Sequence, residues 1–304
     1  MQHVPQRHVS LRVWALLCLM AVIWSGSFPA NRLALAEVDV FTTVAFRVTG
    51  AAVLLWVYIA WRGFALPRGA RWWLTCGILG LLNNAIPFTL IVWGQTRIDS
   101  GLAAILNAST AIFTVAIAGM IFADERMTRT RAIGVALGFA GVVVTIGPAS
   151  LLRLDLTSLA QLAILGASLS YALNSIYARQ ALRGIRPEVS AAGMLTAASV
   201  MMLPLALLSE GLPMLTYAPA TWAALAYLAA IASAFAYILF YTVLSLAGAG
   251  NLSLVTLLIV PIAVLIGAIG FGEVLAPTAW AGFALLAAGL LVIDGRIFRV
   301  KSAG

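Results

Sequence analysis

The sequence predicts an all-α integral membrane protein with ten transmembrane helices arranged as two inverted five-helix repeats. Three observations lead to this prediction: the composition, the length of the apolar runs and an internal repeat. Hydrophobic residues make up 63% of the 304 residues and charged residues 9%, whereas soluble domains carry roughly 25% charged residues. A surface so poor in charge suits hydrocarbon, where only helices and closed barrels pair every backbone polar group. Continuous apolar runs, rather than alternating strands of about ten residues, favour helices.

The apolar runs are close to the roughly 20 residues that a membrane-spanning helix needs. In chain order they cover residues 11–30, 40–61, 72–94, 100–122, 131–147, 157–178, 189–208, 220–246, 251–271 and 277–295. Most connections between them are short and contain glycine, proline or charge. The first run is not expected to be a cleaved signal peptide, because it is long, contains Trp24 and Pro29, and lacks a closing small-x-small site.

The positions of the basic residues predict that both termini are cytoplasmic. If the N-terminus is inside, the inside segments hold fourteen of the eighteen Lys and Arg residues, and the outside segments hold Arg32, Arg97 and Arg153. Such a bias marks cytoplasmic loops. It predicts an even number of spans, with a cytoplasmic N-terminal tail at 1–10 and a cytoplasmic C-terminal tail at 296–304.

The two halves of the chain, 11–147 and 157–295, are similar to each other. An offset of 148 aligns Glu125 with Glu273, Thr130 with Thr278, Gly134 with Gly282 and Gly141 with Gly289, and an offset of 147 aligns Trp24 with Tyr171 and Arg32 with Arg179. Because each half has an odd number of runs, the second half begins on the opposite side of the membrane. Inverted repeats are typical of secondary transporters that work by alternating access. A purely structural duplication is the alternative.

Several of these residues also form the pattern of a known family. A Trp-Ser-Gly-Ser-Phe segment lies at 24–28, Arg47 lies early in the second run, and Glu125 and Glu273 each precede a short polar stretch and a glycine-rich run. The order of these motifs resembles the ten-helix, EamA-type exporters of the drug/metabolite transporter superfamily, over about residues 11–295. The resemblance implies an exporter of amino acids, related metabolites or toxic organic compounds in a bacterial-type inner (plasma) membrane.

Two positions depart from the family pattern. Members often carry a proline midway along the fourth and ninth spans, and here Pro261 is matched by Phe113. Members also often show Ala-Leu near the end of the third span, where this chain has Gly94 and Gln95. The second departure suggests an unusual substrate pocket.

Polar and aromatic side chains inside the runs are the candidate substrate-binding residues, because polar groups in a bilayer usually face the bundle interior or a wet cavity. They are Trp24, Ser27, Asn83, Asn84, Trp93, Asn107, Tyr171, Asn174, Tyr237 and Tyr241. Amides and hydroxyls fix the orientation of a ligand, and aromatic rings stack on it. This set suits small amphiphilic molecules such as amino acids with aromatic or other apolar side chains. The alternative role of each residue is hydrogen bonding between helices.

We expect a cavity between the two halves, lined by the first, third, fourth, sixth, eighth and ninth runs. The fifth and tenth runs are nearly pure Ala, Gly, Val and Leu. We therefore expect them to pack peripherally, where a homodimer contact could form.

Arg47 is the ionisable residue that lies well inside a run, seven residues after Val40 and so about 10 Å deep. It could bind a substrate carboxylate, or it could bond helix-end carbonyls or reach toward the interface. The ten acidic residues, in contrast, fall in loops or at helix ends: Glu37, Asp39, Asp99, Asp124, Glu125, Asp155, Glu188, Glu210, Glu273 and Asp294. We therefore predict uniport or exchange, without a protonated carboxylate in the membrane core, and Glu125 and Glu273 are the nearest exceptions.

Other function classes have little support in the sequence. It contains no P-loop, no metal-binding spacing and no G-x-S-x-G motif, so no enzyme activity, metal or cofactor is expected. The net charge of +8 is scattered through short loops, which argues against a nucleic-acid partner. The expected partners are the lipid bilayer and a small-molecule substrate. A membrane-embedded lipid-modifying enzyme and a channel-like subunit remain as alternatives.

Overall fold

The computed structural model describes residues 10–67, 69–122, 127–146, 156–182, 184–252 and 254–294. The predicted tails, apart from residue 10, and Glu125 lie outside these residues. In the described residues the regular structure is helical. The helices are α1 (Leu11–Ser25), α2 (Ser27–Ala34), α3 (Val40–Arg62), α4 (Ala70–Gly80), η1 (Leu81–Ala85), α5 (Ile86–Gly94), α6 (Ser100–Asn107), α7 (Ser109–Ile121), α8 (Arg129–Ile146), α10 (Leu156–Ala181), α11 (Pro187–Ser209), α12 (Pro219–Ala226), η3 (Tyr227–Phe235), α13 (Ala236–Leu252), α14 (Leu254–Phe271) and α15 (Pro277–Asp294).

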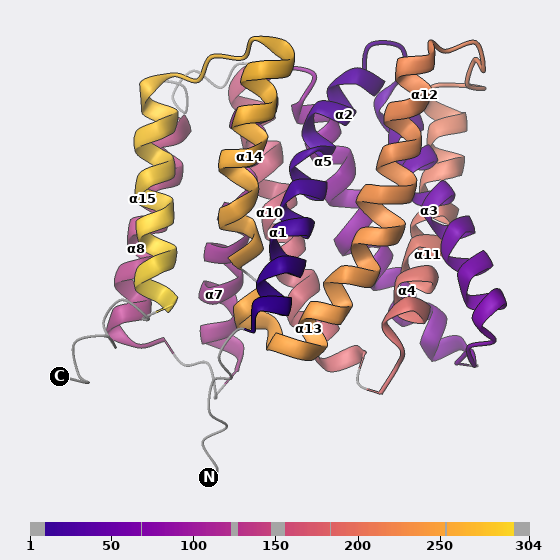
Figure 1. Ribbon diagram of the computed structural model, residues 1–304, viewed down its shortest axis with the longest axis horizontal. Helices are drawn as coiled ribbons and strands as arrows, with labels where there is room; N and C mark the ends of the chain where they lie inside the picture. Colours follow the sequence, from indigo (N-terminus) through magenta and orange to yellow (C-terminus); the bar gives the residue numbers. More distant parts are fainter. Residues whose placement is uncertain are drawn as a thin grey trace.

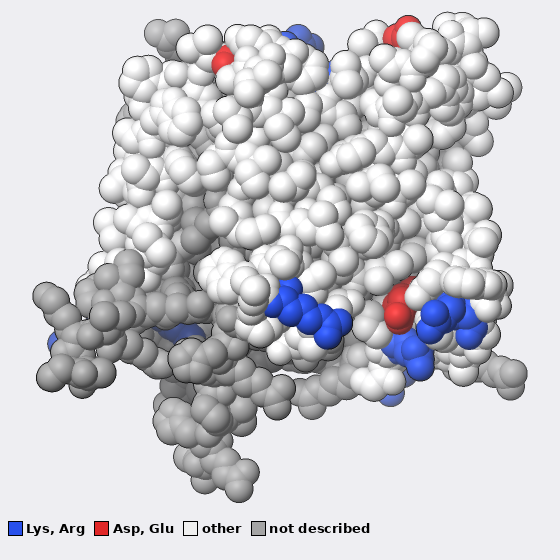
Figure 2. Space-filling model, in the orientation of Figure 1, with Lys and Arg blue, Asp and Glu red and all other residues white. Residues whose placement is uncertain are grey.

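Many of these helices are long and apolar enough to cross a membrane. Within the described residues, seven helical segments meet both conditions: Leu11–Ala34, Val40–Arg62, Ala70–Gly94, Ser100–Ile121, Thr157–Ala178, Pro187–Ser209 and Pro219–Val243. Two shorter apolar helices, Leu258–Phe271 and Pro277–Ile293, follow them. Figure 2 shows that the visible charged side chains lie toward the two ends, with an uncharged band between them. The chain is therefore a multi-pass membrane protein.

The start of α1 and the end of α15 lie at the same end of the bundle (Figure 1). We call this end the terminal end, and the other the distal end. The loop between α2 and α3 and the loop between α14 and α15 both lie at the distal end (Figure 1). This arrangement agrees with an even number of crossings.

Helices α8 and α15 pack against each other at one edge of the bundle (Figure 1). A Cβ atom built on Gly134 would lie 2.6 Å from the carbonyl oxygen of Gly289, and one on Gly141 would lie 2.6 Å from that of Gly282. The two helices are therefore antiparallel, and their backbones approach more closely than any larger residue allows. We call these four glycines the glycine seam.

Two of the long helical segments contain a π-helical stretch near their middle. In η1 the amide of Ile86 donates to the carbonyl of Leu81, and at the end of η3 the amide of Ala236 donates to that of Ile231. Pro87 has no amide hydrogen and its ring would crowd the carbonyl four residues earlier, which gives η1 a local cause. Such wide turns often occur at functional sites.

Candidate substrate site

A group of buried and half-buried polar side chains lies where α3, η1, α10, η3 and α13 meet. It consists of Arg47, Asn83, Asn84, Asn174, Ser233 and Tyr237, which we call the inner polar cluster. Asn83 donates to the Tyr237 hydroxyl at 2.9 Å, and that hydroxyl donates to Oδ1 of Asn84 at 2.8 Å. Asn174 donates to Oδ1 of Asn83 at 3.0 Å. The π-helical stretch η1 thus supplies two adjacent amides that both bond the same tyrosine.

Arg47 carries the charge of this cluster and is 5% exposed. Its Nε donates to the Ser233 hydroxyl at 2.9 Å, and its guanidinium carbon lies 3.8 Å from the centre of the Phe88 ring. It also lies close enough to Tyr171 and Tyr237 to interact electrostatically with their hydroxyls. Both ion pairs found in the described residues involve Arg32, so Arg47 has no carboxylate partner among them.

Aromatic rings border the inner polar cluster along α13. The Phe240 ring centre lies 6.5 Å from that of Tyr237, 5.1 Å from that of Tyr241 and 6.0 Å from that of Trp24. Trp24 also donates from its indole nitrogen to the carbonyl of Ala232 at 3.2 Å. The cluster therefore combines a cation, amides and hydroxyls with an apolar aromatic flank.

Several buried polar atoms near these residues have no hydrogen-bond partner. In the inner polar cluster they are Nδ2 of Asn84, a donor, and Oδ1 of Asn174, an acceptor. A buried polar group left unpaired destabilises a protein by about 1–3 kcal/mol. Such groups are therefore places where a ligand or an ordered water is expected to bind.

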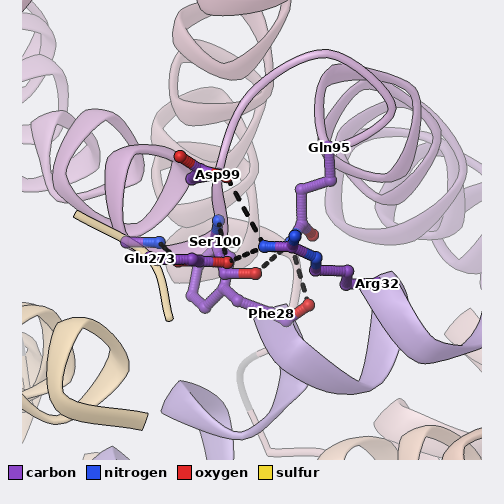
Figure 3. Close-up of polar contacts among 7 residues, drawn as sticks. Phe28, Arg32, Gln95, Asp99, Ser100 and Glu273 are labelled. Atoms are coloured by element: carbon purple, nitrogen blue, oxygen red, sulfur yellow. Dashed lines mark hydrogen bonds and ion pairs between the residues drawn. The ribbon is translucent and has the colours of Figure 1, made fainter. Parts of the chain in front are cut away.

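A second polar group ties helix ends together at the distal end (Figure 3). We call Arg32, Asp99 and Glu273 the distal ionic cluster. Glu273 has a side chain 3% exposed, forms an ion pair with Arg32, and accepts from the backbone amides of Ser100 at 3.1 Å and Gly101 at 3.0 Å. Arg32 also lies 3.5 Å from Asp99. A carboxylate at the N-terminus of α6 is favourable because the helix dipole is positive there.

Gln95 extends this arrangement toward α2. It accepts from Asn31 at 2.9 Å and donates to the carbonyl of Phe28 at 2.9 Å. Figure 3 shows Gln95 and Glu273 converging on the region of Ser100. Gln95 occupies one of the positions that depart from the family pattern, and its amide joins α2 to the turn after α5.

The family assignment follows from comparison with known proteins. The model of the EamA-like transporter family matches residues 12–147 and 158–294. The chain belongs to this family. Each matched segment covers one of the two halves that the internal repeat delimits, so the EamA assignment extends over nearly the whole chain.

Relatives of this EamA protein are named as transporters. A "Probable terminal-alkyne amino-acid exporter" of Streptantibioticus cattleyicolor is 29% identical over 296 residues, 95% of each chain. An "Uncharacterized transporter" of Archaeoglobus fulgidus is 28% identical over 232 residues, 76% of this chain and 79% of that one. A solved crystal structure shares the fold, with a TM-score of 0.67 over 93% of this chain and 98% of that chain at 19% identity.

The structure brings six of the predicted residues of this EamA protein into or beside the inner polar cluster. Arg47, Asn83, Asn84, Asn174 and Tyr237 belong to it, and Tyr171 lies beside Arg47 and Tyr237. Tyr241 and Trp24 reach it through Phe240.

The other three predicted residues have no hydrogen bond to this cluster in the described residues. Ser27 is buried in α2 with an unpaired hydroxyl. Asn107 ends α6, where its backbone carbonyl accepts from Ser168 at 3.3 Å. Trp93 packs against the hydrophobic core that includes Leu17 and Ile164. As for the other predicted residues, their role in binding stays a prediction.

Besides Ser233, three apolar residues of the site were not among the predicted residues. Phe88 faces the Arg47 guanidinium, Phe240 joins the aromatic rings, and the Met194 sulfur accepts from Asn83 at 3.3 Å. In sequence each is one apolar residue among many, because packing against lipid and packing against a cation use the same residue types. The spacing of Phe88, one helical turn after Asn84, is the signal that could have indicated it.

Proposed function

We propose that this EamA-family chain is a secondary transporter that exports small amphiphilic metabolites, with amino acids of aromatic or other apolar side chain as the leading candidates. The observation that carries the proposal is the inner polar cluster, a buried cation with amides and hydroxyls in a chain that is otherwise apolar. Polar groups at this depth are costly and usually serve a substrate or ion path. The name of the Streptantibioticus relative, a probable amino-acid exporter, supports the same substrate class.

The proposed architecture is ten spans in two inverted repeats, with alternating access between them. The glycine seam supports the inversion. The repeat offset of 148 matches Gly134 in the first half to Gly282 in the second, and Gly289 in the second half to Gly141 in the first. The contact between Gly134 and Gly289 thus has an equivalent contact between Gly282 and Gly141. Two further helix contacts are equivalent in the same way. The first span of one half packs against the fourth span of the other: α1 against α14, and α10 against α6 and α7. Repeats of opposite topology provide equivalent openings to the two sides of a membrane.

The proposed location is a bacterial-type inner membrane with both termini in the cytoplasm. The basic residues of the sequence support this orientation. A relative from Escherichia coli, 24% identical over 64% of this chain, carries the name of an inner membrane transporter. The proposed transport mode is uniport or exchange driven by the solute gradient.

Counterflow in proteoliposomes tests this function directly. Vesicles are loaded with unlabelled L-phenylalanine or L-leucine and diluted into a trace of the labelled amino acid. A carrier accumulates label transiently, whereas a channel only equilibrates it and a membrane enzyme produces no counterflow. Tyr237→Phe removes the hydroxyl that joins Asn83 and Asn84, so it should reduce counterflow, while Tyr58→Phe at a distant tyrosine should not. No counterflow across a full amino-acid panel would overturn the proposal.

A further inference from the structure

We propose that Arg47 binds the carboxylate of the transported solute and that Asn84 and Asn174 complete a site for a zwitterionic α-amino acid. This inference rests on the proposed function and narrows it to a substrate with a free carboxylate. In the sequence alone, a structural role for Arg47 was equally open. The contacts around the guanidinium and the two unpaired amide atoms favour the binding role.

The first step concerns the donors that Arg47 has left. The guanidinium carries five N–H groups, and in the described residues only Nε–H has an acceptor, the Ser233 hydroxyl. The Phe88 ring lies 3.8 Å from the guanidinium carbon and covers one flat face. A stacked face leaves the edge, with the Nη N–H groups, for a planar bidentate acceptor such as a carboxylate.

The second step concerns charge. A buried cation needs an opposite charge nearby, or it is strongly unfavourable in the protein interior. In the described residues Arg47 has only a hydroxyl, an aromatic face and neighbouring tyrosines. A ring face and a hydroxyl soften the burial of the charge without neutralising it. A substrate carboxylate would supply the missing negative charge.

The third step concerns the amides beside Arg47. Asn84 and Phe88 lie one helical turn apart on the third span, and Ser233 and Tyr237 lie one turn apart on the eighth, so each pair shares a face. Phe88 and Ser233 contact Arg47, and Tyr237 bonds Asn84. Nδ2 of Asn84 is therefore an uncommitted donor on the helix face that also carries Phe88, and among the described residues it has no hydrogen-bond partner.

The fourth step places the ammonium group. Asn174 is 9% exposed and uses its Nδ2 to bond Asn83, which leaves its Oδ1 as a buried acceptor without a partner. An ammonium group is a donor only. The cluster thus offers uncommitted donors at Arg47 and Asn84 and an uncommitted acceptor at Asn174, which is the complement of an amino-acid head group. The rings of Phe240, Tyr241 and Trp24 provide an apolar flank for the side chain.

The test compares four ligands that differ in one group each. Purified protein is bound to labelled L-phenylalanine, and competition is measured with L-phenylalanine, its methyl ester, phenethylamine and 3-phenylpropanoate. A hydrogen-bonded charge pair predicts that losing the carboxylate, in the ester and the amine, weakens competition roughly ten- to a hundredfold. Loss of the ammonium group in 3-phenylpropanoate should weaken it less, because Asn174 offers a neutral acceptor.

The variants assign these effects to residues. Arg47→Gln should weaken the binding of L-phenylalanine and leave the binding of phenethylamine, which has no carboxylate, unchanged. The affinities of the two ligands should therefore become similar. Arg47→Lys should restore part of the difference in affinity between L-phenylalanine and phenethylamine. Asn174→Leu should instead reduce the difference in affinity between L-phenylalanine and 3-phenylpropanoate, because it removes the acceptor for the ammonium group. Trp56→Phe is the matched control, since it removes a side-chain hydrogen bond of the same helix, from Trp56 Nε1 to the Thr196 hydroxyl, outside the inner polar cluster.

Each result has a defined meaning. If Arg47→Gln weakens all four ligands equally, or if Trp56→Phe has the same effect as Arg47→Gln, Arg47 is structural and the inference is wrong. If the unmodified protein binds phenethylamine as well as L-phenylalanine, the transporter proposal stands and the carboxylate site falls. If the unmodified protein binds and transports none of the amino acids, the proposed function itself fails. Should Arg47→Gln not fold, the ligand comparison on the unmodified protein still decides the question.

Discussion

Glu210 stabilises the start of α3 from a distant part of the chain. Its two carboxylate oxygens accept from the backbone amides of Phe41 at 2.8 Å and Thr42 at 2.7 Å. Glu37 does the same for α12, accepting from the amide of Ala218 and the hydroxyl of Thr221, and these bonds, the one to Thr221 first, lower the pKa of Glu37. With Glu273 on α6, three glutamates cap helices that they do not belong to.

We predict that Glu210→Ala lowers the stability of the protein by about 1 kcal/mol, the usual effect of losing a helix cap. Thermal unfolding in detergent would measure this. Asp39→Asn is the control, because Asp39 precedes α3 directly but its side chain makes no capping bond. Equal destabilisation by the two substitutions would contradict the assigned cap.

These caps mark the limit of what the sequence could predict at the residue scale. Asp39 and Asp99 stand directly before α3 and α6, where local patterns place the cap, yet neither side chain caps its helix. Glu210 and Glu273 do so instead, and their roles depend on which helix ends the fold brings together. The candidate site was predictable by residue type, because amides and an arginine in apolar runs stand out. Phe88 and Met194, which contact this site, could not be predicted, because in sequence they cannot be distinguished from apolar residues that face lipid.

At the scale of elements, the glycine seam is the packing most sensitive to size. We predict that Gly282→Val destabilises the protein strongly, because a Cβ there would meet the Gly141 carbonyl oxygen at 2.5 Å. Overpacking of this kind typically costs about 1–3 kcal/mol. Gly77→Ala is the control, since a Cβ at Gly77 has no atom within 4 Å, and alanine favours a helix over glycine. Thermal unfolding of both variants would check the pair, and a stable Gly282→Val protein would show that the seam is wrong.

The distal ionic cluster joins elements from both halves of the chain. We predict that Glu273→Gln makes opening at the distal end easier, because it weakens the bond to Arg32 and the cap on α6. The measurement is the rate at which a thiol reagent labels Ser100→Cys in a background where Cys18 and Cys76 are replaced by alanine. Glu210→Gln, a cap on α3, is the matched control and should leave this rate unchanged. A labelling rate equal in all backgrounds would mean that the cluster does not restrain this end.

Helical periodicity predicted the elements well and their internal breaks poorly. Every predicted run lies largely on helices in the described residues, which leave out residues 147, 253 and 295 of the runs 131–147, 251–271 and 277–295. The break at η1 has a local signal in Pro87, but the π-helical stretch η3 has none. One extra residue in a turn rotates the following side chains by about 100°. A π-helical stretch therefore changes which face the side chains after it present.

At the scale of the whole molecule, topology is the first prediction. We expect reporter fusions after residue 304 and within the α3–α4 loop to report the cytoplasm, and fusions within the α2–α3 loop to report the outside. The basis is the excess of basic residues in the segments assigned to the inside. An extracellular C-terminus would rule out both an even number of spans and the proposed inversion.

The second prediction at this scale concerns energy coupling. We expect amino-acid uptake into proteoliposomes to be unchanged by an imposed pH gradient, because in the described residues no carboxylate lies in the inner polar cluster. Glu273 is buried but lies at the distal end in an ion pair. If a pH gradient drives accumulation and Glu273→Gln abolishes it, while Glu210→Gln does not, transport is coupled to protons and the prediction is wrong.

The glycine seam also bears on association between copies of the chain. Its four glycines are occupied within one molecule, so a second copy cannot dock on them. The outward face of α8 carries small residues as well as large ones: Ala132, Ala136 and Ala140 are exposed at intervals of four, beside the exposed Ile133 and Val143. A homodimer formed along this edge would therefore have to bring its backbones together over these alanines, in competition with lipid tails, and its strength would vary with the acyl chains of the surrounding membrane.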